Sequence, residues 1–556
     1  MATVTGAQLL VRMLKAEGVK HVFTLSGLHI APIYAACVEE GIAVVDTRHE
    51  QGAAHAADAM ARLTRGIGVC AVTAGPGVTD ALTGIANAFA ASSPVLLLGG
   101  AAPTFNAGRG SLQEMEQVDL FTRITKWSDR IPSPDRVPVY LAKAFRTMLT
   151  GRPGPVFLEV PWDVLSNGVD DEEVKLPVSY RTLARQPGDE AFIARAAQLF
   201  TKAARPAIIA GGSIWWDDAA APLAALAAKL GAPVYLNGAG RGCLPADHPH
   251  FFSQTRKEAL AEADVVLIAG TPLDFRLGYG AGIGEEARII QVDSDPTEIG
   301  RNRAVEVGII GDSRTVLTQL AAAVGGPAGE GRTASARSGD WLEGLRARET
   351  KKAAKQAVFE ASTQTPVHHF RLARELDRVA RACGDAMFVA DGGNWVAIAA
   401  KVIKLSKPGR WLDPGPLGCL GVGAPFAIAA KLLHPDRTVF VIQGDGSFGL
   451  NGFDFETALR FKLPMVCVVG NDAAWGQIRL PQVQFHGVEK SPGTLLAPTR
   501  YDKVVEAFGG YGELVTDPEQ IGAALERAVA SNTVACVNVM LDPEAPAASG
   551  AQGYAI

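Results

Sequence analysis

The sequence predicts an α/β protein built from three doubly wound parallel-sheet domains. Short runs that are apolar throughout alternate with longer amphipathic segments, as strands covered by helices on both faces require. Two stretches rich in polar and small residues, at 167–189 and 325–337, interrupt this alternation and are typical of linkers. We therefore expect domains at residues 1–165, 188–325 and 360–540, followed by a tail at 541–556.

Each predicted domain has its own set of buried strands. In the first domain, apolar side chains at Leu9, Leu10, Met13 and Leu14 predict a helix of the mature fold rather than a leader sequence. The middle domain lacks a GxGxxG motif, which favours a structural role but leaves FAD or ADP binding open. The strands are expected at 22–25, 42–45, 69–73, 95–98, 156–160, 207–210, 234–236, 265–269, 289–292, 387–390, 438–442 and 464–469.

Composition limits the partners and the compartment. The net charge of −5 and a pI near 6.1 give no reason to propose a nucleic acid or an anionic membrane as partner. No apolar run approaches the length of a membrane span. The seven cysteines are scattered and form no CxxC pair, as expected for reduced thiols in a cytoplasmic protein.

Two acidic residues follow neighbouring predicted strands of the third domain. Asp445 lies between Gly444 and Gly446 after the strand at 438–442, and Asp472 follows the strand at 464–469. The interval between them fits one strand–helix–strand crossover, which would place both acids at the carboxyl edge of one parallel sheet. The glycines predict a sharp turn with exposed backbone amides. Two hard oxygen donors beside such amides suit Mg²⁺ holding a diphosphate.

This stretch, Gly444-Asp445-Gly446-Ser447 through Asn471-Asp472, resembles the signature of thiamine diphosphate enzymes, GDG followed after a fixed gap by NN. The resemblance extends over essentially the whole chain, to the acetolactate synthase, benzaldehyde lyase and 2-hydroxyacyl-CoA lyase family. It implies that Asp445, Asp472 and the backbone carbonyl of Ala474 bind the metal. The second Asn of the family is Asp472 here; because Asp offers the same kind of oxygen, we expect the site to survive.

The resemblance also implies residues that bind thiamine diphosphate. Leu420 would be the bulky residue that bends the two cofactor rings toward each other. Trp475 would point toward the substrate side, although packing of the following helix explains it equally well. The other cofactor-binding residues implied are Gly75, Asn87, Gly393, Asn394, Gly418, Gly446 and Ser447.

Three residues of the first domain are candidates for catalysis. Glu50 follows the strand at 42–45, and the resemblance implies that it hydrogen-bonds to the cofactor's pyrimidine ring and starts its activation. Burial should raise the pKa of Glu50. His29 and Gln113 fall where benzaldehyde lyase carries active-site residues, and His29 would relay protons to and from the substrate hydroxyl. A lone His is, however, more often structural.

These residues predict a carbon–carbon lyase or carboligase that acts on 2-hydroxy ketones or 2-hydroxyacyl-CoA thioesters. Decarboxylation of a 2-keto acid followed by carboligation, as in acetolactate synthase, is the alternative. A non-catalytic relative that binds the cofactor for regulation is the alternative of another class. The family resemblance implies a homodimer at minimum, and a homotetramer made of two dimers. The tail at 541–556 either covers the site as a lid or forms a disordered end.

Overall fold

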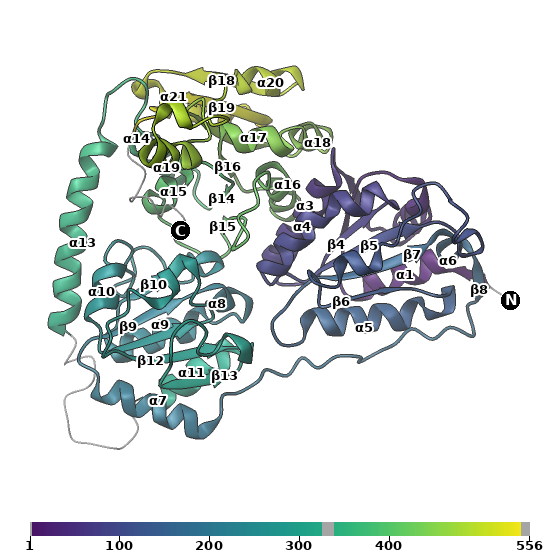
Figure 1. Cartoon of the computed structure of the whole chain (residues 1–556), viewed down its shortest axis with the longest axis horizontal. Helices are drawn as coiled ribbons and strands as arrows, with labels where there is room; N and C mark the ends of the chain where they lie inside the picture. Colours follow the sequence, from purple (N-terminus) through teal and green to yellow (C-terminus); the bar gives the residue numbers. More distant parts are fainter. Residues whose placement is uncertain (1–2, 325–338, 546–556) are drawn as a thin grey trace.

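The computed structural model describes residues 3–324 and 339–545. It contains three parallel-sheet α/β domains, as the sequence predicts, and Figure 1 shows them as three separate sheets with helices on their faces. The linker predicted at 325–337 and the part of the tail at 546–556 lie outside the described residues.

The first domain is a six-stranded parallel sheet in the order β3-β2-β4-β5-β7-β6. A short antiparallel pair, β1 and β8, lies beside it. Strand β6 escapes the sequence analysis because it is a half-exposed edge strand that carries two charged residues. The elements are β1 (Thr3–Thr5), α1 (Gly6–Ala16), β2 (His21–Thr24), α2 (Ala31–Glu40), β3 (Ala43–Asp46), α3 (Glu50–Thr64), β4 (Gly68–Val72), α4 (Pro76–Ala90), β5 (Val95–Ala101), β6 (Trp127–Arg130), α5 (Val137–Leu149), β7 (Val156–Pro161), α6 (Trp162–Ser166) and β8 (Gly168–Asp170).

The middle domain is a five-stranded parallel sheet in the order β10-β9-β11-β12-β13. The four predicted strands are present, and the edge strand β13 is additional. The expectation that this domain binds no FAD or ADP stays a prediction. The elements are α7 (Glu190–Lys202), β9 (Pro206–Ala210), α8 (Gly212–Trp216), α9 (Ala220–Leu230), β10 (Val234–Leu236), α10 (Arg256–Glu262), β11 (Val265–Ala269), β12 (Arg288–Asp293), β13 (Val307–Ile310) and α11 (Ser313–Ala323).

The third domain has six parallel strands in the order β15-β14-β16-β17-β19-β18, which repeats the topology of the first domain. The long helix α13 precedes it along one side of the molecule (Figure 1). The elements are α13 (Gly339–Glu360), α14 (His369–Ala382), β14 (Met387–Ala390), α15 (Asn394–Val402), β15 (Trp411–Leu412), α16 (Gly423–Leu433), β16 (Val439–Gly444), α17 (Asp445–Asn451), α18 (Asp454–Arg460), β17 (Met465–Asn471), α19 (Gly476–His486), α20 (Tyr501–Ala507), β18 (Tyr511–Val515), α21 (Ile521–Ala530) and β19 (Val534–Met540).

The shared topology places a switch point in each of these two sheets. In the first sheet β2 lies between β3 and β4, and in the third β14 lies between β15 and β16. Chain connections leave such a point in opposite directions, so a crevice opens at the carboxyl ends of the two central strands, where α/β sheets bind ligands. The crevices are therefore formed by the loops after β2 and β4 and by the loops after β14 and β16.

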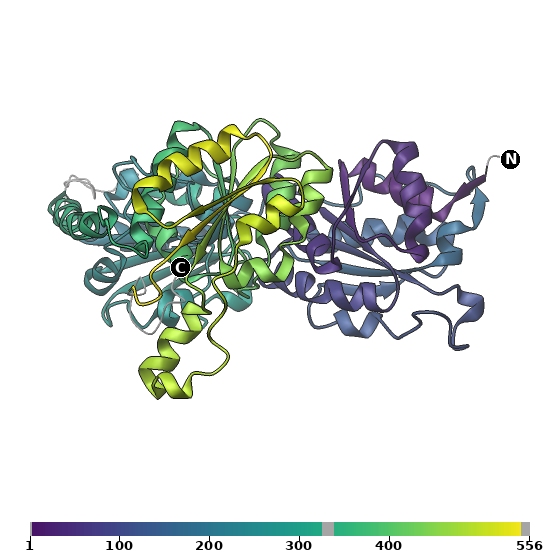
Figure 2. The ribbon, with the colours of Figure 1, turned by 90° about the horizontal axis from the view of Figure 1, so that it is seen from above.

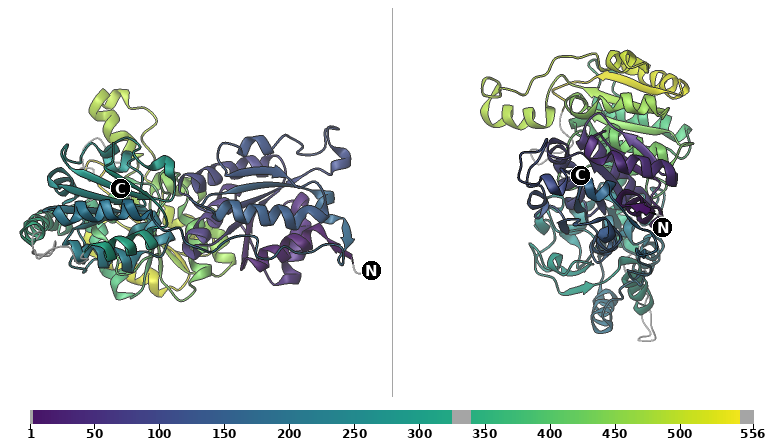
Figure 3. Two further views of the ribbon diagram at one scale, coloured as in Figure 1. Left: turned by 90° about the horizontal axis from the view of Figure 1, so that it is seen from below. Right: turned by 90° about the vertical axis from the view of Figure 1, so that its right-hand side faces the viewer.

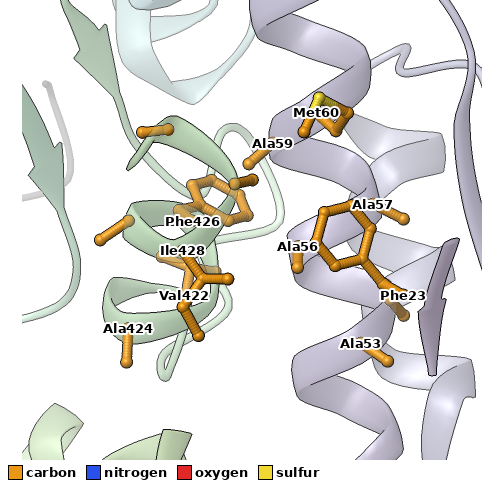
Figure 4. Close-up of a cluster of buried hydrophobic side chains, with 14 of the residues drawn as sticks. Phe23, Ala53, Ala56, Ala57, Ala59, Met60, Val422, Ala424, Phe426 and Ile428 are labelled. Carbon is orange, nitrogen blue, oxygen red and sulfur yellow. The ribbon is translucent and has the colours of Figure 1, made fainter. Parts of the chain in front are cut away.

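The first and third domains share one hydrophobic core, centred on α3 and α16. Figure 4 shows alanines of α3, among them Ala56 and Ala59, facing Phe426 and Ile428 of α16. Small side chains on α3 let the two helices approach closely, and the fully buried ring of Phe426 fills the space between them. Full burial of one such ring contributes about 1.5–3 kcal/mol. The two domains are thus held together by packing within one chain.

Helix α19 stands away from the body of the molecule in the views of Figures 2 and 3. It starts directly after Trp475, and several of its apolar side chains and those of the following loop are exposed, including Ile478 and Phe485. Within the described residues, no helix is both long and apolar enough to cross a membrane. The seven cysteines are all free thiols, and five of them are buried.

Candidate active site

Asp445 and Asp472 lie together at the carboxyl edge of the third sheet. Strands β16 and β17 are neighbours with Gly444 opposite Gly470, so the residues that follow them come close in space. The backbone N–H of Ala474 donates to Oδ2 of Asp445 and to Oδ1 of Asp472, at 3.2 Å in each case. The structure thus brings the two predicted acids side by side.

The electrostatics of this pair are unfavourable without a cation. Burial raises the pKa of Asp445 to about 6. The pKa of Asp472 rises to about 7, first because of burial and second because of the negative charge of Asp445. Two buried carboxylates that repel each other fit a dication, and magnesium takes such oxygen ligands. The metal-binding role of both stays a prediction.

If Asp445 and Asp472 bind a metal ion, a backbone oxygen would have to be the third protein ligand. Among the described residues, no group of three or more His, Cys, Asp and Glu side chains could hold a metal ion. The sequence analysis assigns the third ligand to the carbonyl of Ala474. In the structure the amide of Ala474 is turned toward both acids, and the role of its carbonyl stays a prediction.

The glycines around Asp445 act differently from the sequence expectation. The sequence predicts a sharp turn with exposed amides, but helix α17 begins at Asp445 and Gly444 has an ordinary extended backbone. The N–H of Gly446 is not exposed for a ligand, since it donates to Oδ1 of Asp445 at 2.9 Å. Gly446 is required for space, since a Cβ there would lie 2.5 Å from the ring of Trp475. The ring of Trp475 therefore packs against Gly446, next to Asp445.

The loop after β14 lies against the loop after β16. The N–H of Gly444 donates to the carbonyl of Gly392 at 2.7 Å, and the hydroxyl of Ser447 donates to the same carbonyl at 2.9 Å. Gly393 is the N-cap of α15 at a φ of 142°, a conformation open to glycine. The side-chain Nδ2 of Asn394 is buried and has no hydrogen-bond partner within the described residues.

The unpartnered Nδ2 of Asn394 tests whether this site fits a diphosphate. A Cβ on Gly476 would lie 3.4 Å from the Cβ of Asn394 and would also contact the carboxylate of Asp472, so Asn394 lies next to the acid pair. A buried donor without a partner costs free energy unless a ligand accepts its hydrogen bond. Phosphate oxygens held by a cation would supply that acceptor. The residues present therefore fit a metal–diphosphate group.

Asp391 fixes the loop that carries Gly418 and Leu420, a role that the sequence analysis missed. Its carboxylate accepts the backbone N–H groups of Gly392, Gly421 and Gly423 at 2.6, 2.9 and 2.7 Å. Burial nevertheless raises its pKa to about 6. Leu420 packs directly on Gly392, where a Cβ would overlap its side chain, whereas the space around Gly418 is open.

Arg62 of the first domain holds the same loop from the other side. Its guanidinium forms a bidentate pair with Asp58 at 2.7 and 2.6 Å and donates to the carbonyl of Asp413 at 2.6 Å. Asn87 is fully buried next to this pair and donates to Asp58 at 3.1 Å. The side chain of Asn87 thus faces α3, and its predicted place beside the thiazolium ring stays a prediction.

Glu50 is the first residue of α3 and is buried. Its pKa is raised, mainly by burial and further by the charge of Asp80, which confirms the predicted direction. A Cβ on Gly77 would lie 3.3 Å from Oε1 of Glu50, so the start of α4 lies against the carboxylate. None of the contacts described for Glu50 within residues 3–324 and 339–545 joins it to Asp445 or Leu420.

His29 and Gln113 are brought together by Thr73, which the sequence analysis placed only at the end of a strand. Oγ1 of Thr73 lies 3.0 Å from Nδ1 of His29 and donates to Oε1 of Gln113 at 3.4 Å. Gln113 has a left-handed backbone, with φ at 61°, and sits against Gly75, where a Cβ would lie 2.9 Å from the carbonyl of Gln113. Burial lowers the pKa of His29, so the imidazole is neutral near pH 7.

A small cavity borders Gln113. It lies at the carboxyl ends of β5 and β7, and apolar side chains such as Met115 and Pro161 line much of it. Arg130 also reaches the cavity, but its guanidinium is paired with Glu159.

The first and third domains have sheets of equal topology, and a further parallel-sheet domain lies between them in the sequence. The third domain holds a buried acid pair, and the first holds Glu50, His29 and Gln113. Together these features define a three-domain α/β enzyme architecture. Three family models match the chain: the N-terminal thiamine pyrophosphate (TPP) binding domain of thiamine pyrophosphate enzymes at residues 4–120, the central domain at 193–320, and the C-terminal TPP binding domain at 391–539. The chain belongs to the thiamine pyrophosphate enzyme family.

Individual relatives agree with this assignment. A probable acetolactate synthase of Mycobacterium bovis is 38% identical over 97% of this chain and 96% of the relative. The 2-hydroxyacyl-CoA lyase 2 of Caenorhabditis elegans is 35% identical over 92% of this chain and 84% of the relative. The 2-hydroxyacyl-CoA lyase 2 of Homo sapiens is 36% identical, covering 92% and 85%. The chain is therefore similar both to an acetolactate synthase and to 2-hydroxyacyl-CoA lyases.

Proposed function

We propose that the protein is a thiamine diphosphate- and Mg²⁺-dependent carbon–carbon lyase or carboligase. It would act on a small molecule, a 2-hydroxy ketone or a 2-hydroxyacyl-CoA thioester. The observation that carries this proposal is the cluster of His29, Thr73 and Gln113, because a neutral imidazole held beside an amide suits removal of a proton from a substrate hydroxyl. Similarity to 2-hydroxyacyl-CoA lyase 2 over most of the chain supports it.

The cofactor would be held by groups already in place. Asp445 and Asp472 would bind Mg²⁺, Asn394 would donate to the diphosphate, and Leu420 would support the bent ring system. When bound, thiamine diphosphate supplies a nucleophilic carbon and takes up the electron pair that is released when a carbon–carbon bond breaks. The raised pKa of Glu50 lets its carboxyl group keep a proton for a ring nitrogen.

The protein's own groups would handle the substrate. His29 takes the proton from the substrate hydroxyl and returns it when the reaction runs toward bond formation. Gln113 lines the small cavity and is linked to His29 through Thr73, so it would orient the substrate oxygen near His29. Met115 and Pro161 line the same cavity and would contact the less polar part of the substrate.

A second copy of the chain would complete the site. Large apolar side chains flank both halves of it: Leu28 and Leu112 are 75% and 76% exposed beside His29 and Gln113, and Leu417 and Leu450 are 49% and 50% exposed beside the cofactor loop. Exposed apolar side chains at a site are typical of a surface that a partner covers. We propose a homodimer in which Glu50 of one chain meets Asp445 of the other, and a homotetramer made of two such dimers.

Acetolactate synthase chemistry is the second candidate. The 38% identity to the Mycobacterium bovis relative, over nearly the full length of both chains, favours decarboxylation of a 2-keto acid followed by carboligation. Both candidates use the same metal and cofactor residues. They differ in the group that leaves, carbon dioxide in one case and an aldehyde or acyl fragment in the other.

Three separate incubations of the holoenzyme distinguish the candidates. The protein loaded with thiamine diphosphate and Mg²⁺ is mixed with benzoin, a 2-hydroxyacyl-CoA or pyruvate, and released aldehyde and carbon dioxide are measured, with a Glu50→Gln variant as control. We expect aldehyde from benzoin or the thioester, lost in the variant. Carbon dioxide from pyruvate alone contradicts the first proposal and supports the second. Cofactor binding without any product supports a non-catalytic relative.

A further inference from the structure

Thr73 occupies the switch point of the first sheet. It follows β4, while His29 lies beyond the end of β2, and these two strands are the central neighbours at which the chain connections diverge. Its hydroxyl is the atom that joins His29 to Gln113. Thr73 therefore contacts two members of the predicted catalytic set, His29 and Gln113.

We propose that Thr73 is a positioning residue that holds His29 in the tautomer with the proton on Nδ1, so that Nε2 is free to accept the substrate proton. This inference rests on the proposed function for its use in catalysis, but the tautomer is a property of the protein alone.

The tautomer follows from the hydrogen-bonding capacity of each group. A Thr hydroxyl has one proton, and an amide oxygen can only accept. Because Oγ1 of Thr73 donates to Oε1 of Gln113 at 3.4 Å, it has no proton left for His29. With the Gln113 amide placed this way, the ring donates in the 3.0 Å contact between Nδ1 of His29 and Oγ1 of Thr73. In a neutral imidazole this leaves Nε2 unprotonated.

The side chain of Gln117 supports both His29 and Gln113, the two residues that Thr73 joins. Oε1 of Gln117 accepts the N–H of Gly75 at 2.8 Å, and Gly75 packs against Gln113. Nε2 of Gln117 donates to the carbonyl of Gly100 at 3.1 Å, and a Cβ on Gly100 would lie 2.6 Å from the Cβ of His29. Gln117 is almost fully buried, so both supports are rigid.

Packing fixes Thr73 as well. A Cβ on Gly27 would overlap the side chain of Thr73, and a Cβ on Gly77 would lie 2.9 Å from its methyl carbon. The residue is thus wedged between the turn that leads to His29 and the start of α4, which also contacts Glu50. This arrangement separates its two functions: the methyl group packs, and the hydroxyl sets the hydrogen bonds.

In the competing arrangement the side-chain amide of Gln113 is flipped by 180°, so that its oxygen and its NH₂ group exchange places. Its NH₂ group would then donate to Thr73, whose proton would pass to Nδ1 of His29, and Nε2 would carry the ring proton. In that state Nε2 donates and cannot take a proton. The two arrangements therefore predict opposite tautomers for the same three residues, which makes the choice measurable.

The test is a ¹⁵N NMR spectrum of the protein without cofactor, labelled on the histidine rings, with His29→Asn used to assign the His29 signals. We expect the wild-type protein to show a protonated Nδ1 and an unprotonated Nε2. Thr73→Val keeps the shape but removes the hydroxyl, and should shift His29 toward the Nε2–H form. Thr73→Ser keeps the hydroxyl and should retain the wild-type pattern. A wild-type Nε2–H form, or an unchanged spectrum in Thr73→Val, overturns the proposal.

Kinetics with the loaded enzyme then separate this inference from the proposed function. Thr73→Val should lower kcat for carbon–carbon cleavage by about 10–100-fold while KM changes less, and Thr73→Ser should restore most of kcat. Equal losses in both variants indicate a packing role and contradict the inference. If the NMR result is as expected but no substrate is cleaved, the proposed function fails while the assignment of the tautomer holds.

Discussion

Asp445 and Asp472 set the electrostatics of the site at the level of single residues. Their pKa values, about 6 and about 7, lie above the ordinary value of 3.8, so the folded protein without metal binds their protons more tightly than the unfolded chain does. Stability is therefore lost as the pH rises from about 4 through 7. A bound dication would replace these protons and restore the stability that is lost as the pH rises.

Asp472→Asn tests this directly. Removing one of two facing charges should make the metal-free protein more stable at pH 8, by at least about 3 °C in melting temperature, which corresponds to roughly 1 kcal/mol. It should also reduce the fall in melting temperature between pH 5 and pH 8. The measurement is a set of melting curves with and without Mg²⁺. An equal pH dependence in the wild-type and variant proteins shows that the acids do not repel each other.

Glu50 carries the second residue-scale prediction. Glu50→Gln preserves size and removes the titrating proton, so activity should fall by at least about 10²-fold. Because burial already raises the pKa of Glu50, loss of the charge should leave the melting temperature equal or higher at pH 8. The neighbouring, more exposed acid Asp80, changed to Asn, is the control: it should stay active while lowering the pKa of Glu50, since its charge contributes to the raised value. Full activity in Glu50→Gln refutes the assigned role of the carboxyl group.

Asp391 acts at the scale of elements, because its one carboxylate joins the end of β14 to the loop before α16. Asp391→Asn places an amide nitrogen against N–H donors, and leaving one such donor unpaired costs about 1–3 kcal/mol. Leu420 would then lose its fixed position on Gly392. We expect at least tenfold weaker thiamine diphosphate binding, measured by calorimetry, and a lower melting temperature.

The exposed Asp436, after the same helix α16, gives the matched control for this prediction. Asp436→Asn should change neither cofactor affinity nor melting temperature. Unaltered affinity in Asp391→Asn shows that the loop keeps its shape without these three hydrogen bonds.

Most strands that are continuous apolar runs were predictable from the sequence, including the edge strands β3 and β10, but the buried strand β19 was not among those predicted. Strands such as β16 and β17 are continuous apolar runs, so their positions and the acids that follow them could be predicted. The edge strand β6 carries polar residues and gives no such run. Thr73 and Asp391 were missed for another reason: each acts through backbone and side-chain partners from distant segments, which only the fold brings together.

At the scale of the whole molecule, the predicted catalytic groups are divided between two domains of the same topology. Glu50, His29 and Gln113 belong to the first domain, and the acid pair belongs to the third. Within one chain these domains are fixed by the packing of α3 on α16 (Figure 4), not through the predicted site. Exposed apolar side chains around both halves leave room for a second chain.

Complementation between two inactive variants tests the central claim that Glu50 and Asp445 serve one site built from two chains. Glu50→Gln and Asp445→Ala chains are co-expressed in equal amounts, purified together and loaded with thiamine diphosphate and Mg²⁺. Random pairing should return about a quarter of the wild-type activity, because half of the pairs are mixed and each mixed pair has one intact site. Activity no higher than that of either variant alone, in preparations shown to contain mixed assemblies, contradicts the account.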